Sequence, residues 1–148
     1  MRRRRAAGLA PAPPFSLGDL TTPHPTELPS AVGSFMQAET TPIQITVHEV
    51  RELQASAEPF LLLDCREPDE HAIARISGSL LLPMGLIPER MAELEAFRNQ
   101  RIVVHCHHGV RSLRVARFLR ERGFAVAQSM AGGIEAWSLE IDPAMPRY

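Results

Sequence analysis

Four short apolar runs, separated by amphipathic stretches, constrain the fold of this chain most strongly. The runs are PFLLLDC (59–65), SLLLPM (79–84), RIVVHC (101–106) and AVAQSM (125–130). The first three contain too few polar residues for a strand with one solvated face, because such a strand alternates apolar and polar side chains. Runs of this kind are typical of parallel strands that helices cover on both faces. The sequence therefore predicts a sheet whose two faces are both buried.

The stretches between these runs have helical patterns. TVHEV offers a capping box, with Thr46 as the N-cap and Glu49 three residues later. PERMAELEAF (88–97) begins with proline, which is favoured in the first turn of a helix, and RSLRVARFLRERG (111–123) ends with glycine where a C-terminal cap belongs. Strand–helix alternation predicts the α/β class, with right-handed crossovers and ligands at the carboxyl ends of the strands. Cys106 lies at such an end.

Composition and charge narrow the class of protein. With 148 residues the chain is long enough for one domain with a buried core. A net charge of -1 at pH 7 gives no reason to expect nucleic acid or a membrane surface as a partner, and no apolar stretch approaches the length that spans a bilayer. Two cysteines do not make a disulfide framework, so we expect a reducing compartment and a cytoplasmic protein.

The first 41 residues differ in composition from the rest. They begin with MRRRR and continue with segments rich in proline, serine and threonine, without helical or strand periodicity. Such a segment buries too little apolar surface to offset its ordering entropy. We therefore expect residues 1–41 to be a disordered or extension tail, with a true start at Met36 as one alternative, and residues 42–148 to be the domain. No apolar secretion segment follows the arginines, whereas organelle import stays open.

The stretch CHHGVRS (106–112) connects a predicted buried strand to a predicted helix. A tight loop that enters a helix turns its backbone N–H groups inward, and the helix N-terminus adds positive potential. A cysteine placed there shifts towards the thiolate, which is its nucleophilic form. Gly109 permits a backbone conformation that a Cβ atom would hinder. Arg111 can close the loop as a fixed cation, and Ser112 can cap the helix.

Two other interpretations compete with a nucleophilic Cys106. A free cysteine at a strand end is often a small buried apolar residue, but the order of strand, cysteine, glycine, arginine and helix favours the reactive interpretation. A zinc site is the second alternative, with ligands from His105, Cys106, His107 and His108. Adjacent residues of an extended strand point to opposite faces, and no second ligand pair stands elsewhere in the sequence. We therefore expect neither a metal nor a cofactor.

Five segments, in this order, resemble the single-domain rhodanese-like sulfurtransferases. They are DCREPDEH (64–71), ARISGSLLLPM (74–84), VVHCHHGVRS (103–112), FLRERGF (118–124) and MAGGIEAW (130–137). The resemblance covers about residues 43–148 and implies a rhodanese-like parallel sheet of about five strands flanked by helices on both faces. It also implies a catalytic Cys106 within an active-site loop of His107, His108, Gly109, Val110, Arg111 and Ser112.

The resemblance implies that Cys106 alternates between a thiolate and a persulfide. A small-molecule donor such as thiosulfate, or a protein or small-molecule persulfide, loads the cysteine, and a thiol or cyanide removes the sulfur. Two alternatives are a sulfur-relay or binding module with little turnover, and a phosphatase or arsenate reductase. Related phosphatases place five residues between the cysteine and the arginine, whereas four stand here, and the smaller loop suits a sulfur atom better than a phosphoryl group. His107 replaces a basic residue that many family members carry, which bears on donor preference.

Residues outside the loop receive supporting roles. By the same resemblance, Asp64 and Arg66 end the strand that neighbours the Cys106 strand. We expect Arg66 to pair with Asp64 or with a glutamate of the same motif and to support the loop from behind. We expect Cys65 to fill the core. The alternative is a resolving thiol that meets an oxidised Cys106.

Overall fold

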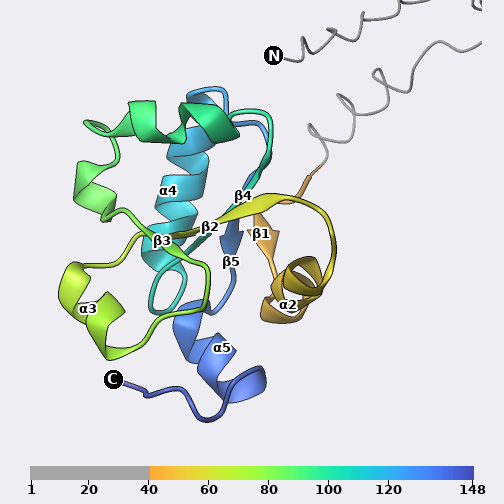
Figure 1. The fold of residues 1–148 in the computed structure, drawn as a ribbon. Helices are drawn as coiled ribbons and strands as arrows, with labels where there is room; N and C mark the ends of the chain where they lie inside the picture. The colour runs from red at the N-terminus through yellow and green to blue at the C-terminus, as the bar shows by residue number, and fades with distance from the viewer. Residues whose placement is uncertain (1–40) are drawn as a thin grey trace, which may run out of the picture. The chain divides into compact units, whose positions relative to one another are not determined.

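Five parallel strands form one sheet in residues 41–148, which are the residues that the computed structural model describes. The strands are β1 (Gln44–Ile45), β2 (Phe60–Asp64), β3 (Leu80–Leu81), β4 (Arg101–His105) and β5 (Ala127–Met130). Their spatial order is β1-β5-β4-β2-β3, so β4, which precedes Cys106, is the central strand (Figure 1). The predicted tail lies outside the described residues, apart from its last position.

Helices cover both faces of this sheet, which confirms the predicted α/β class and the five-stranded parallel sheet. α4 (Val110–Glu121) packs against one face, while α2 (Val47–Ala55) and α5 (Gly133–Glu140) pack against the other (Figure 1). A short helix, α3 (Pro68–Ile73), follows β2. Within residues 41–148, no helix is both long and apolar enough to cross a membrane.

Local sequence signals set several helix ends. The predicted capping box begins α2, because the Thr46 hydroxyl accepts from the Glu49 N–H at 3.1 Å and the Glu49 carboxylate accepts from the Thr46 N–H at 2.8 Å. Gly123 follows α4 with a φ of 95°, a left-handed conformation that suits glycine. The N-cap of α4 is Gly109 and not Ser112, so the prediction that Ser112 caps the helix is wrong. Ser112 lies in the first turn, and it is fully buried.

The segment PERMAELEAF does not form the predicted α-helix. It contains a 3₁₀ helix, η2 (Met91–Phe97), which follows a shorter one, η1 (Met84–Leu86). Met91, Leu94 and Phe97 all pack in the apolar cluster under α4. They are spaced by three residues, and side chains at this spacing lie on one face of a 3₁₀ helix. The apolar period therefore favours the tighter helix over the α-helix.

Alternation along β4 directs the side chain of Cys106. Ile102, Val104 and, one step beyond the strand, Cys106 pack in the cluster under α4, whereas Val103 packs in the cluster with α2 and α5. Successive side chains of a strand point to opposite faces of the sheet. The cysteine therefore lies between the sheet and the start of α4.

Candidate active site

The Cys106 sulfur accepts hydrogen bonds from the loop that follows it. The backbone N–H groups of Gly109 and Ser112 donate to the sulfur at 3.0 and 3.4 Å, and the Ser112 hydroxyl lies 3.5 Å from it. A hydrogen bond from the Cys65 thiol, together with those from Ser112 and Gly109, outweighs burial and lowers the pKa of Cys106 to about 4. Cys106 is therefore a thiolate at neutral pH.

The first turn of α5 holds the loop in place. The N–H of Ile134 donates to the Cys106 carbonyl at 2.9 Å, and the N–H of Glu135 donates to the His107 carbonyl at 3.1 Å. Because these carbonyls are bound by α5, the N–H groups later in the loop are left to face the sulfur. Gly133 permits the approach: its φ is 61°, and a Cβ atom there would lie 2.3 Å from the His107 carbonyl oxygen. The motif MAGGIEAW carries part of the family resemblance, but its sequence does not reveal this anchoring role.

A buried ion pair lies at the end of β2, the strand that pairs with β4. Nε and Nη2 of Arg66 donate to the two carboxylate oxygens of Asp64 at 2.9 and 2.7 Å, and both side chains are fully buried. This confirms the predicted pairing. Burial by itself would raise the pKa of Asp64, but the bonds from Arg66 and the nearby His105 and His71 lower it to about 2. The pair is therefore charged at neutral pH.

Arg111 reaches from α4 to α3. Its two terminal nitrogens each lie 2.8 Å from an oxygen of the Glu70 carboxylate. The hydrogen bonds from Arg111 are the main reason that the pKa of Glu70 falls to about 2. Such a two-point contact fixes both the position and the plane of the guanidinium group. The sequence indicated a cation here, but it did not reveal that Glu70 is its counter-ion.

Tyr148 connects the two ion pairs. Its hydroxyl accepts from Nη1 of Arg66 at 2.7 Å and donates to the Glu70 carboxylate at 3.1 Å. Its ring stacks on that of His107 with the centroids 4.1 Å apart. No pattern in the sequence pointed to this residue, because all of its partners are distant along the chain.

The histidines of the motif do not converge on one point. His105 is fully buried, with Nε2 3.9 Å from the Asp64 carboxylate, whereas His107 and His108 stack on each other in the loop. Burial lowers the pKa of His107, which leaves a neutral ring beside the loop at neutral pH. Across residues 41–148, no cluster of three histidine, cysteine or acidic side chains could hold a metal ion.

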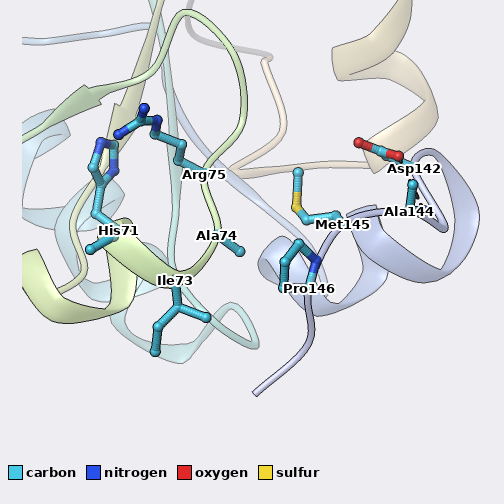
Figure 2. A pocket seen from close by; sticks show the side chains of 9 residues that line it. His71, Ile73, Ala74, Arg75, Asp142, Ala144, Met145 and Pro146 are labelled. Carbon is cyan, nitrogen blue, oxygen red and sulfur yellow. Dashed lines mark hydrogen bonds between the residues drawn. The ribbon is translucent and has the colours of Figure 1, made fainter.

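Two hollows lie near these groups. One, of about 360 Å³, borders the loop and is lined in part by His108, Gly109, Arg114 and Arg117. Figure 2 shows the other, also of about 360 Å³, between α3 and the segment that follows α5. The second hollow contains no residue of the loop, and Cys106 lines neither of the two.

The fold is an α/β domain in which the anionic sulfur of Cys106 lies in a loop at the N-terminus of a helix. The chain belongs to the rhodanese-like domain family, whose sequence profile matches residues 46–140. The solved rhodanese-like domain protein from Staphylococcus aureus is similar, with a TM-score of 0.60 and 29% identity over 65% of this chain and 91% of that one.

Two relatives show the range of proteins that contain this domain. Over 110 residues the chain is 38% identical to "Adenylyltransferase and sulfurtransferase MOCS3-2" of Zea mays, a match that covers 71% of this chain and 23% of the relative. Over 84 residues it is 39% identical to "Sulfurtransferase" of Allochromatium vinosum, covering 57% of this chain and 77% of the relative. The chain therefore spans about a quarter of the length of the plant relative.

Substitution of Gly133 by alanine tests whether α5 anchors the loop. Gly78 is the matched control, because its φ of 81° is also left-handed but an added Cβ atom would meet nothing within 4 Å. We expect Gly78→Ala to cost about 1 kcal/mol of unfolding free energy through backbone strain alone. Gly133→Ala should cost roughly 1–3 kcal/mol more through overpacking, and it should slow alkylation of Cys106. Equal costs and unchanged alkylation in both variants would contradict the anchoring role.

Proposed function

We propose that this protein is a sulfurtransferase that carries sulfane sulfur as a persulfide on Cys106. Its family and its relatives named sulfurtransferase support sulfur transfer in general. The proposal of a persulfide on Cys106 is supported by the charge and the hydrogen bonds of the Cys106 sulfur. This sulfur is a thiolate at neutral pH, and two backbone N–H groups of one short loop donate to it.

The proposed reaction has two nucleophilic steps. The Cys106 thiolate attacks the sulfane sulfur of the donor, whose S–S bond breaks. Sulfite leaves from thiosulfate, or a thiolate leaves from a persulfide, and the outer sulfur of the new persulfide carries the negative charge. An acceptor thiolate or cyanide then attacks this outer sulfur, and the electrons of the S–S bond return to Cys106. No metal, cofactor or net proton is needed.

The loop suits an anionic intermediate. Oriented N–H groups at a helix N-terminus stabilise negative charge without reorganisation. In the resting protein, the N–H groups of Gly109 and Ser112 already donate hydrogen bonds to the Cys106 sulfur. A persulfide extends the same anion by one atom, so the groups that stabilise the thiolate also lie next to the intermediate.

The charge around Arg111 bears on which class of sulfur donor the site favours. Thiosulfate is a dianion, and Arg111 is the one arginine of the loop, but Glu70 binds both of its terminal nitrogens. Because the Arg111–Glu70 pair is neutral as a whole, its long-range attraction for a dianion is weak. A persulfide donor depends less on this attraction. This observation favours a persulfide donor and gives weight to the second candidate, a sulfur-relay module that turns thiosulfate over slowly.

Intact mass after incubation with thiosulfate tests the proposed function. Wild type should gain the mass of one sulfur atom, and a cyanide chase should remove it. Cys106→Ser should gain nothing and lose all thiosulfate:cyanide activity, because its hydroxyl stays protonated near neutral pH. The unfolding midpoint of the variant serves as the control for folding. Sulfur uptake or full activity in Cys106→Ser would contradict the proposal, and uptake without steady turnover would favour the relay module.

Variants of the Arg111–Glu70 pair test which donor the loop accepts. Loss of a charge-assisted contact of about 1.5–3 kcal/mol should lower kcat/KM for thiosulfate roughly ten- to a hundredfold in Arg111→Ala. An alkyl persulfide without other charges should lose less. Glu70→Gln is the matched control, because it removes the counter-ion and leaves the cation, so kcat/KM for thiosulfate should hold or rise. Equal losses for both donors in both variants would mean that the pair only holds the loop together.

A further inference from the structure

Cys65 lies directly beside Cys106. β2 and β4 pair in parallel with Asp64 opposite His105. The ladder continues one step further, because the N–H of Cys65 donates to the His105 carbonyl at 3.1 Å. The next pair in this register is therefore Cys65 and Cys106, and both side chains pack in the cluster under α4.

The side chains of Cys65 and Cys106 point to the same face of the sheet from paired positions on neighbouring strands. Neither cysteine is in a disulfide, and a hydrogen bond from Cys65 is the largest of the influences that lower the pKa of Cys106. Neighbouring strands lie about 4.8 Å apart, which falls within the range of about 4.4–6.8 Å between Cα atoms that a disulfide spans. Cys65 is completely buried, and Cys106 is the only other cysteine of the chain.

We propose that Cys65 is an internal acceptor, which resolves a persulfide on Cys106 when no external acceptor arrives. This inference rests on the proposed function, because it requires the persulfide. The Cys65 thiol gives up its proton, and its sulfur attacks the inner sulfur of the persulfide. The S–S bond breaks, and the outer sulfur leaves with the bond's electrons and the proton as hydrosulfide. A Cys65–Cys106 disulfide remains.

The electrons in this step balance without an added oxidant. The two cysteine sulfurs lose two electrons as they join, and the sulfane sulfur gains two as it becomes sulfide. The oxidising power comes from the donor that loaded Cys106. The protein thereby releases its sulfur and protects Cys106 as a disulfide, which an external thiol can reduce again.

In the resting protein, Cys65 is a protonated thiol and therefore a poor nucleophile. Its hydrogen bond to Cys106, reinforced by burial, raises the pKa of the Cys65 thiol. Loading with sulfur moves the negative charge of Cys106 from the inner to the outer sulfur, which weakens the first of these causes. Cys65 remains a slow nucleophile in its buried position, so an external acceptor that attacks the outer sulfur reacts first. The internal step then matters only when acceptors are scarce.

A persulfide decay experiment on the full chain tests this inference. The protein is loaded with thiosulfate, freed from donor by desalting, and kept without acceptor, while samples are alkylated and weighed intact. Wild type should first carry one extra sulfur. It should then lose that sulfur, release one sulfide per chain and end two hydrogens lighter than the reduced chain. The product should resist alkylation until reductant is added. Peptide mapping should link Cys65 to Cys106.

Two variants supply the comparison. Cys65→Ser keeps a hydroxyl as a hydrogen-bond donor, and Cys65→Ala removes the donor, so together they separate the chemistry of Cys65 from its hydrogen bond. Both should still gain sulfur and should keep it at least roughly tenfold longer than wild type, since neither residue can form a disulfide. Peptide mapping of wild type stands even if a variant fails to fold.

The outcomes separate the two proposals. Loading of wild type followed by equally slow decay in wild type and both variants, with no Cys65–Cys106 peptide, would overturn the internal acceptor and leave the proposed function intact. No loading of wild type at all would overturn the proposed function, and the internal acceptor with it. A mapped persulfide on Cys65 would also overturn the inference, because it would show attack on the outer sulfur.

Discussion

The two hydrogen bonds from the first turn of α5 to the carbonyls of Cys106 and His107 fix the loop on which the site depends. A loop of this length has few conformations that direct several N–H groups at one atom, and binding its carbonyls from behind selects such a conformation. Gly133 makes the contact possible, because any side chain would occupy the space of those carbonyl oxygens. The surroundings of the Cys106 sulfur thus depend on the packing of α5 against the loop that follows β4.

Charge around the loop is arranged in paired groups. Asp64 pairs with Arg66 behind the strand ends, Glu70 pairs with Arg111 beside the loop, and Tyr148 bonds to both pairs. Arg66 and Asp64 are fully buried, so either charge would be costly without the other, whereas the Arg111–Glu70 pair is partly exposed. The Cys106 sulfur is therefore anionic because of nearby N–H, O–H and S–H donors more than because of a free cation.

The sequence was sufficient to predict the parts of the site that follow from local order. Apolar runs predicted the parallel sheet, although the run at 79–84 forms only the short edge strand β3, where Leu80 is exposed. The position of Cys106 after another run placed it at a strand end before a helix. Glu70, Gly133 and Tyr148 were not assigned their roles, because these roles arise from contacts between segments far apart in the chain. Ser112 was assigned to a cap on local grounds, yet tertiary packing turns it towards the Cys106 sulfur instead.

The central claim is that the fold makes Cys106 a thiolate at neutral pH. The most direct test is a pH titration of thiolate ultraviolet absorbance in wild type, with Cys106→Ser subtracted as the blank and circular dichroism confirming that the protein stays folded. The structure predicts a midpoint at about 4, with full thiolate absorbance already present at neutral pH. A midpoint near the ordinary cysteine value of about 8.5 would contradict the account, because the loop would then hold an inert thiol.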